Sequence, residues 1–381
     1  MRFLRFLRKV KRSWSSHRTS VEVLISCGAL LNNLEQYQKA YPNVAIAPVL
    51  KANAYGHGLV EVAEILEKKN LPFFVLDSMH EAMILRNSGI KTKILLIGHT
   101  RILNIETAKI KNTSFTITSL EQLEELDKIL SSKRDIHLKI DTGMHRQGVL
   151  PDDLDRAIKI IKENRLINLE GVCSHLADAE KEDSELTEKQ IEQWERAVGL
   201  LKKEFSNIKF FHLSSTAGSN LSSAVSANVL RIGLGLYGID SSPEKKLELI
   251  PALELVSIIS SVREIASGEK VGYGATFVAD KPTEVATVPV GYFEGVDRRL
   301  SNRGFLKVGD KFCKIVGRVS MNITSIDVSD VDSVRIGNKV SIISARPEDE
   351  NSVENIARVI DSIPWVILVH IPQGLRRVVV V

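Results

Sequence analysis

A chain of 381 residues has room for two or three domains, or for one large domain with a smaller one beside it. Its 44% hydrophobic and 26% charged residues, with 23 Gly and 11 Pro, exclude disordered, collagenous and coiled-coil proteins. No apolar run approaches the ~18 residues that a membrane-spanning helix requires. The formal charge of +4 comes from the first 20 residues; the remainder is mildly acidic, which argues against a nucleic-acid-binding surface.

The first 17 residues form a basic extension. Phe3, Leu7, Val10 and Trp14 fall on one helical stripe, and arginine and lysine fill most of the remaining positions. A basic amphipathic helix of this kind can bind weakly to an anionic membrane surface, and a disordered or weakly helical start is the other interpretation. The extension lacks the continuous apolar core of a secretory signal.

The three cysteines, Cys27, Cys173 and Cys313, are widely spaced and form no CxxC pair. They support neither a disulfide framework nor a zinc site. We therefore expect a reducing, cytoplasmic compartment and no metal ligands.

After residue 40 the chain alternates short β-rich runs with charged amphipathic stretches, which predicts a parallel sheet with helical crossovers. The eight β-rich runs are Val44–Leu50, Phe73–Leu76, Ile94–Ile97, Phe115–Thr118, Ile136–Ile140, Leu169–Ser174, Phe210–Leu213 and Val229–Ile232. The helical stretches include Leu59–Lys69, Leu120–Leu130, Asp153–Glu163 and Thr187–Glu204. Eight such units over about 200 residues predict a (β/α)8 barrel. A doubly wound open sheet is the alternative, although it normally has fewer strands and no GxGxxG follows the first run.

From about Ser242 the pattern changes to alternating or β-branched runs separated by Gly, Pro and Asp turns. These runs are Val256–Val262, Glu284–Val290, Lys314–Val316, Thr324–Val328 and Lys339–Ile343, and only Val353–Ile360 predicts a helix. The sequence thus predicts a basic extension over residues 1–17, a (β/α)8 barrel over 18–242 and a mainly-β domain over 243–381.

Reactive side chains of a barrel stand at the carboxyl ends of its strands. The first run closes with Lys51, and residues 51–58 read Lys-Ala-Asn-Ala-Tyr-Gly-His-Gly. A partly desolvated lysine is a competent amine nucleophile, whereas a strand-end lysine taken alone is more often a surface residue.

The segment from Lys51 to Gly58 resembles the pyridoxal-phosphate (PLP) lysine motif of the alanine racemase family, and the resemblance continues from about residue 18 to residue 381. It implies a barrel followed by a C-terminal β domain, with PLP attached to Lys51. It also implies a head-to-tail homodimer with shared active sites. The implied activity is the interconversion of L- and D-alanine, which supplies D-alanine for peptidoglycan.

Further motifs match the positions that hold PLP in the family. Arg231 closes the eighth run and stands where an arginine faces the pyridine nitrogen. Because arginine stays protonated, it keeps that nitrogen unprotonated and makes the cofactor a weaker electron sink. The phosphate positions correspond to Tyr55 and Thr216 and to the backbone amides of Ile232 and Gly233.

Racemisation needs a proton acceptor on one face of the α-carbon and a donor on the other. Lys51 serves one face, and Tyr273 matches the second base of the family, which comes from the other subunit. A tyrosine between glycines is otherwise a turn aromatic, and its ordinary pKa of about 10 is too high for this work at neutral pH. His175 and Arg231 resemble the family network that holds and tunes this tyrosine.

Four residues resemble the family's substrate-binding positions. Arg146 corresponds to the arginine near the substrate carboxylate, and Lys139 to a lysine that is often carbamylated in relatives; an ordinary ion-paired lysine is the other interpretation. Tyr292 corresponds to a tyrosine of the entry channel. The backbone N–H of Met321 corresponds to one that meets the substrate carboxylate from the second subunit.

Three departures from the family pattern bear on the substrate. Asn322 stands where many members have aspartate, Ser215 replaces an asparagine, and Trp365 replaces a tyrosine that binds the phosphate and crowds the substrate methyl group. Because an indole cannot supply the tyrosine hydroxyl, the sequence defines the reaction better than the substrate. Alanine is the first choice, with serine or a broader range of amino acids as alternatives.

Two further classes of protein share the lysine strand. A non-catalytic, barrel-only PLP carrier would lack the C-terminal domain that holds Tyr273 and Met321. A barrel-type PLP decarboxylase would pair the pyridine nitrogen with a carboxylate instead of Arg231.

Overall fold

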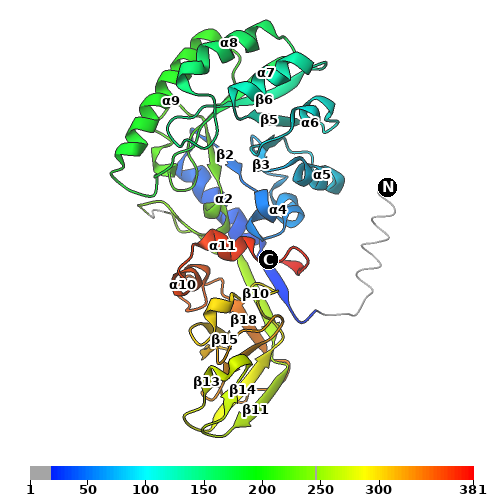
Figure 1. Ribbon diagram of the computed structural model, residues 1–381, viewed down its shortest axis with the longest axis vertical. Helices are drawn as coiled ribbons and strands as arrows, with labels where there is room; N and C mark the ends of the chain where they lie inside the picture. The colour runs from blue at the N-terminus through cyan, green and yellow to red at the C-terminus, as the bar shows by residue number, and fades with distance from the viewer. Residues whose placement is uncertain (1–18, 245–246) are drawn as a thin grey trace.

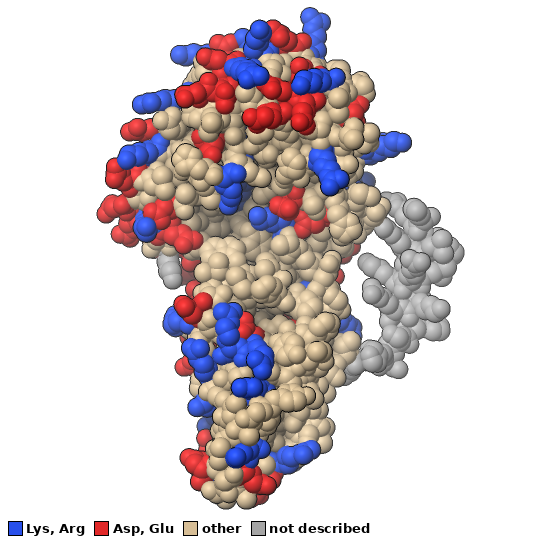
Figure 2. All heavy atoms as spheres, in the orientation of Figure 1, with Lys and Arg blue, Asp and Glu red and all other residues tan. Residues whose placement is uncertain are grey.

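The computed structural model describes residues 19–244 and 247–381, so the basic extension over residues 1–17 lies outside the described residues. The barrel occupies one end of an elongated molecule and the β domain the other, with helix α11 (Pro364–Val369) at their junction (Figure 1). On the face shown in Figure 2, charged side chains of both signs cover the outer end of the barrel, whereas the junction carries few of them.

Eight parallel strands form the barrel, and each overlaps one of the eight predicted runs, which confirms the prediction of eight strands. They are β2 (Ala45–Pro48), β3 (Phe74–Leu76), β4 (Ile94–Leu96), β5 (Thr113–Ile117), β6 (Arg134–Lys139), β7 (Ile167–Cys173), β8 (Phe210–His212) and β9 (Val229–Ile232). Strands β3 to β8 are paired in sequence order, and β2 pairs with β9. A bridge between Val49 and Val75 joins β2 to β3, and the Asn228 N–H donates to the Phe211 carbonyl between β8 and β9. The sheet therefore curls back to its first strand.

Helices cover the outside of this sheet (Figure 1). They are α2 (Cys27–Ala40), α4 (Leu59–Leu66), α5 (Met79–Ser88), α6 (Ile102–Thr107), α7 (Leu120–Ile129), α8 (Leu154–Glu163) and α9 (Glu185–Glu204). The short α3 (Lys51–Tyr55) lies instead at the carboxyl end of β2. Helix α8 shows why they form: Leu154, Ala157, Ile158 and Ile161 recur at helical spacing and are buried, while its other face is charged.

The expected repeat of eight full β-then-α units is incomplete at its end. Strands β8 and β9 are followed by single 3-10 turns, Ser219–Leu221 and Leu234–Tyr237, instead of α-helices. Helix α2 precedes the first barrel strand and contacts both β2 and the turn after β9. Its buried Leu30, Leu34 and Tyr37 cover this part of the barrel.

The second part of the chain is mainly β, as predicted. Its strands are β10 (Leu253–Ile258), β11 (Ser261–Ile265), β12 (Lys270–Val271), β13 (Phe277–Val278), β14 (Thr283–Val288), β15 (Phe305–Val308), β16 (Lys311–Lys314), β17 (Thr324–Asp327), β18 (Lys339–Ile343) and β19 (Arg376–Val380). The predicted run Val256–Val262 is two strands, because the chain turns between Ile258 and Ser261. The predicted helix is α10 (Val353–Val359), and α11 is a second helix that the sequence analysis missed.

Strand β1 (Glu22–Ser26) belongs to the largest sheet of the β domain, whose order is β16-β15-β18-β10-β1-β19. It pairs antiparallel with β10 and parallel with β19. The predicted domain boundaries remain a prediction, but the start of the chain is hydrogen-bonded into the sheet formed by its end. Within the described residues, no helix has the length and apolar character needed to cross a membrane.

The central place of β1 predicts a large effect of truncating its inward side chains. Ile25 is fully buried, so Ile25→Ala should lower the free energy of unfolding by about 2–5 kcal/mol, through lost burial and a residual cavity. Leu103→Ala, at a side chain that is 69% exposed, is the control and should change it by less than about 0.5 kcal/mol. Thermal and urea unfolding measure both; similar effects of the two substitutions would contradict this role of β1.

Candidate active site

A cavity of about 780 Å³ opens at the carboxyl ends of the barrel strands. It brings together eight of the residues expected from the barrel: Lys51, Tyr55, Lys139, Arg146, His175, Thr216, Arg231 and Gly233. Ile232 is fully buried in β9 and does not line the cavity through its side chain. Strand ends far apart in the sequence thus supply one pocket that is rich in cationic side chains.

The backbone that follows Lys51 is strained. Ala52, Asn53, Ala54 and Tyr55 have φ angles of 51° to 56°, so α3 contains a left-handed turn made without glycine. Such a conformation costs roughly 1–2 kcal/mol per residue for an L-amino acid. Strain of this kind persists only where the surroundings over-determine it, and it concentrates at functional sites.

Two side chains from distant elements hold this turn. The Glu81 carboxylate accepts from the Ala52 N–H at 2.7 Å, and it also accepts from the N–H groups of Asp77 and Ser78. From β19, Arg377 donates twice to the Gly56 carbonyl, at 3.0 and 2.8 Å. The position of Lys51 therefore depends on a contact from α5 of the barrel and on one from the last strand of the β domain.

Arg231 is buried and its guanidinium has a fixed set of acceptors. One terminal nitrogen donates to His212 Nδ1 at 2.6 Å and to the His212 carbonyl at 2.7 Å. The other donates to the carbonyls of Ser174 and Leu213, each at 2.8 Å, and to His175 Nδ1 at 3.2 Å. Within the described structure Nε has no hydrogen-bond partner, which leaves one N–H donor for a ligand in the cavity.

His175 is neutral in this setting. Burial, followed by the positive charges of Arg231, Arg146 and Lys139, lowers the pKa of His175 to about 3. Because arginine can only donate, Nδ1 of His175 must be the unprotonated nitrogen and Nε2 carries the hydrogen. His175 therefore offers one N–H donor.

Two hydroxyls form a corner suited to an anion. Thr216 Oγ1 accepts from the N–H groups of Gly233 and Gly235 at 3.1 and 3.2 Å, so its own hydrogen is left to donate. The Tyr55 hydroxyl lies beside Gly233, where a Cβ would come within 2.7 Å of it, and it has no hydrogen-bond partner among the described residues. Burial raises the pKa of Tyr55 to about 12, which keeps it a donor. These residues fit a phosphate group.

Lys139 and Arg146 lie at the same cavity without a carboxylate partner in the described part of the chain. Burial, with the charges of Arg231 and Arg146, lowers the pKa of Lys139, although Cys173 and Asp141 oppose this shift. The ion-paired interpretation of Lys139 therefore finds no partner among these residues.

Three predicted site residues do not line the cavity. Tyr273, Tyr292 and Met321 lie in the β domain and are 72%, 44% and 55% exposed. They belong to neighbouring loops: the Tyr292 N–H donates to the Ser320 carbonyl, and a Cβ on Gly274 would lie 3.1 Å from the Arg318 guanidinium. Within a single chain these three residues are exposed on the β domain and do not contribute to the cavity.

Asn322 and Trp365, two of the three departures from the family pattern, have defined neighbours in the structure. The Asn322 amide donates to Glu294 at 2.6 Å, and Glu294 in turn accepts from the Gly291 N–H at 2.8 Å. An aspartate at position 322 would instead place two carboxylates side by side. Trp365, on α11, lines the cavity together with Lys51.

The sequence analysis missed His137, Glu170 and His212, which lie inside the barrel next to this site. Each is a polar residue with apolar neighbours in the chain, at a position where a barrel interior normally takes an aliphatic side chain. That signal was present in the sequence.

Fold and site together define an enzyme of the two-domain barrel class. The Lys51 amine follows the first barrel strand and lines the same cavity as the Tyr55 and Thr216 hydroxyls, and a β domain follows the barrel. Two family models match the chain, "Alanine racemase, N-terminal domain" over residues 25–241 and "Alanine racemase, C-terminal domain" over residues 252–379. The chain belongs to the alanine racemase family.

Individual relatives agree with the family models. The alanine racemase of Lactobacillus acidophilus is 35% identical over 377 residues, which cover 95% of this chain and 98% of that protein. Alanine racemase 1 of Caldanaerobacter subterraneus is 34% identical, covering 94% of each chain. The alanine racemase structure from Clostridium difficile 630 has a TM-score of 0.88 at 28% identity, covering 96% of this chain and 97% of that one. The structure from Bacillus anthracis with bound L-Ala-P has a TM-score of 0.87 at 27% identity, covering 96% of each.

The left-handed turn yields a stability prediction. Ala52 is exposed, so Ala52→Gly removes a methyl group without lost packing and should raise the free energy of unfolding by about 1 kcal/mol. The control Gln38→Gly, at an exposed position of right-handed helix α2, should lower it by about 0.5–1 kcal/mol. Urea unfolding of both variants measures the difference; destabilisation by Ala52→Gly would contradict strain in this turn.

Proposed function

We propose that the barrel cavity binds PLP on Lys51 and that the chain interconverts L- and D-alanine. The alanine racemase family is PLP-dependent, and its members are isomerases. The observation that carries the proposal is the meeting of the Lys51 amine, the Arg231 Nε donor and the hydroxyl corner in one cavity. When bound, PLP supplies the electron sink that makes the α-proton of an attached amino acid removable.

Around the cofactor each residue has one task. Tyr55 and Thr216 donate hydroxyl hydrogens to the phosphate, aided by the backbone around Ile232 and Gly233. Arg231 would hold the pyridine ring through its Nε–H and, because arginine stays protonated, would leave the ring nitrogen unprotonated, which would limit side reactions such as transamination. Lys51 exchanges a proton at the α-carbon from one face.

Tyr273 of a second copy completes the pocket from the opposite face. Support comes from its high exposure and from the free Nε2–H of His175, which is a suitable donor to a tyrosine oxygen. A donor to that oxygen would hold the Tyr273 hydroxyl in the pocket, on the face of the α-carbon opposite Lys51. Lys51 and Tyr273 then act as the two opposed bases.

The substrate carboxylate is held from both subunits. Arg146 supplies a planar pair of donors from the barrel, and Met321 supplies its backbone N–H from the second copy. A carbamate on Lys139 would give Arg146 the anionic partner that it lacks. Tyr292, in the loop beside Met321, lies at the entrance. Trp365 shapes the space around the substrate side chain.

A homodimer is supported by the apolar surface around Tyr273. Contiguous exposed apolar side chains mark interaction sites on soluble proteins. Those on the neighbouring segments of the β domain are Val278, Tyr292, Phe293, Met321 and Ile323. In this proposal the enzyme acts in the cytoplasm and supplies D-alanine for peptidoglycan.

The alternatives are not favoured. Both domain models match the chain, whereas a barrel-only carrier would match one, and Arg231 stands where a decarboxylase would have a carboxylate. A serine or broad-range racemase is not favoured either, because the relatives are alanine racemases, although Trp365 and Asn322 depart from the family pattern.

Mixing two inactive variants tests the shared site. Lys51→Ala and Tyr273→Phe homodimers should each lose alanine racemisation, because each site lacks one base. After subunit exchange at equal amounts, half of the dimers are mixed and have one intact site of two, so roughly a quarter of wild-type activity should return. Chiral chromatography of alanine measures it. No recovery despite demonstrated exchange would contradict the two-subunit site, and full activity of Tyr273→Phe alone would contradict the second base.

A further inference from the structure

A row of polar side chains runs through the barrel interior from Arg231 to the beginning of the strands. It passes from Arg231 in β9 to His212 in β8, then to His137 in β6 and Glu170 in β7. Both histidines are fully buried and Glu170 is 5% exposed. We call this row the Arg231–Glu170 relay.

The hydrogen positions in the relay are fixed by its ends. Arg231 donates to His212 Nδ1 at 2.6 Å, so His212 carries its hydrogen on Nε2. That nitrogen lies 2.7 Å from His137 Nδ1, which must therefore accept, so His137 also carries its hydrogen on Nε2. His137 Nε2 lies 3.7 Å from a carboxylate oxygen of Glu170, which is longer than a hydrogen bond, and Glu170 is the one group of the relay that can only accept.

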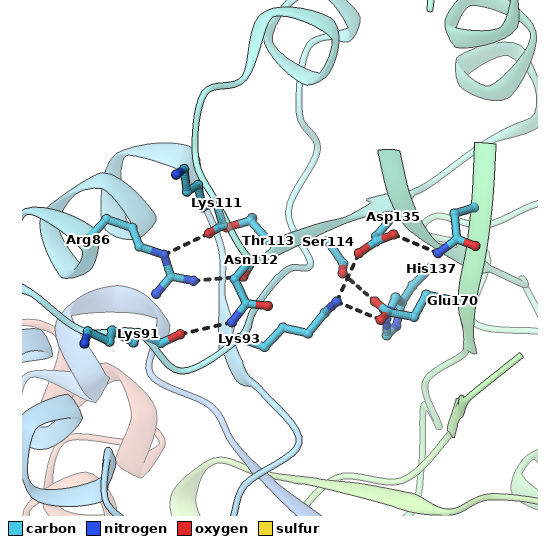
Figure 3. Close-up of polar contacts among 11 residues, drawn as sticks. Arg86, Lys91, Lys93, Lys111, Asn112, Thr113, Ser114, Asp135, His137 and Glu170 are labelled. Carbon is cyan, nitrogen blue, oxygen red and sulfur yellow. Dashed lines mark hydrogen bonds and ion pairs between the residues drawn. The ribbon is translucent and has the colours of Figure 1, made fainter. Parts of the chain in front are cut away.

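Glu170 is held as an anion by other donors. Lys93 donates to Oε1 and Ser114 to Oε2, each at 2.7 Å (Figure 3). Burial pushes the pKa of Glu170 up, but the nearby His137 and the hydrogen bonds from Lys93 and Ser114 outweigh it and lower that pKa to about 2. Lys93 also contacts Asp135 at 3.2 Å, so its charge is shared between two carboxylates.

The backbone is shaped for this contact. In the β6–β7 pairing, Ile136 lies opposite Leu169 and His137 opposite Gly171, so Glu170 is the extra residue of a β-bulge. Bulges of this kind redirect a side chain and are designed features, not defects. A Cβ at position 171 would lie 2.5 Å from His137 Nδ1, so only glycine leaves room for the imidazole.

The aromatic residues around His137 keep the relay dry. Phe73 meets its ring edge-on at 5.6 Å and Phe210 stacks on it at 5.8 Å. Burial lowers the pKa of both His137 and His212, which keeps them neutral. In a medium of low polarity, hydrogen-bonded groups in a chain polarise one another.

Arg231 needs such support because its charge is buried without a carboxylate in contact, among the residues that the structure describes. We infer that Glu170 is a positioning residue that, through His137 and His212, holds the proton on Arg231 and keeps its Nε–H free as a donor to the cavity. The functional part of this inference rests on the proposed cofactor site. The arrangement of hydrogens in the relay follows from the contacts within the barrel and does not depend on that site.

The test uses four proteins, each as the full chain: the wild type, two variants of the relay and one control variant. The wild type comes first. Without added PLP, proton and 15N spectra of histidine-labelled protein between pH 6 and 9 should show His212 and His137 neutral, each protonated on Nε2 and slow to exchange with water. A charged His212, or a hydrogen on its Nδ1, would overturn the relay whether or not PLP binds.

Glu170→Gln removes the carboxylate charge. It should speed the exchange of the His137 and His212 ring hydrogens with water by about tenfold, the factor to which a change of one pKa unit corresponds. With PLP and alanine, the share of turnovers that end in transamination, giving pyruvate and pyridoxamine phosphate, should also rise about tenfold, because Arg231 holds its proton less tightly.

His137→Phe is the second variant, since it cuts the relay while leaving the Glu170–Lys93 pair and the aromatic packing in place. It should shift exchange at His212 and the transamination share in the same direction. The matched control is Asp349→Asn, because Asp349 is a buried carboxylate that also accepts from a lysine and a serine, Lys307 and Ser344. Equal changes in the control, or none in either relay variant, would overturn the inference; a wild type that binds no PLP would instead overturn the proposed function.

Discussion

The burial of the Arg231 guanidinium is the constraint on which the rest of the site depends. Its terminal nitrogens carry four N–H hydrogens, which are shared among five neutral acceptors on strands β7 and β8 or on the residues that follow them. The one donor left is Nε, at the cavity. The hydrogens of His175 and His212 are then determined, because both rings accept from the same cation. Arg231 thus determines which nitrogen carries the hydrogen in His175, at the cavity, and in His212, toward the barrel interior.

The second constraint is the left-handed turn after Lys51. It is held by Glu81 from within the barrel and by Arg377 from the last strand of the β domain. That last strand pairs with β1, which lies at the start of the described chain. Lys51 is therefore positioned by both parts of the molecule, because one of the two side chains that hold the left-handed turn comes from the sheet of the β domain. This connects the stability of the β domain to the geometry of the barrel pocket.

Much of this arrangement could be predicted from the sequence, because it is local. The eight barrel strands are short apolar runs, and Lys51, Arg231 and His175 stand at or just beyond their carboxyl ends. What could not be predicted depends on distant partners: β1 is an ordinary five-residue run whose neighbours are more than 200 residues away. The left-handed turn contains no glycine before position 56 to mark it. His137, Glu170 and His212 form a connected row only once three strands are placed side by side.

The most direct test of the whole account is proton exchange on free amino acids by the purified chain. L-alanine, L-serine and L-lysine are incubated in heavy water with added PLP, and D-isomer formation and α-deuteration are followed together. The account predicts D-alanine with deuterium at the α-carbon. Conversion of serine or lysine at a similar rate would indicate that Trp365 and Asn322 widen the substrate pocket. If the chain binds PLP but exchanges the α-proton of none of the three amino acids, the result would contradict the proposed racemase activity.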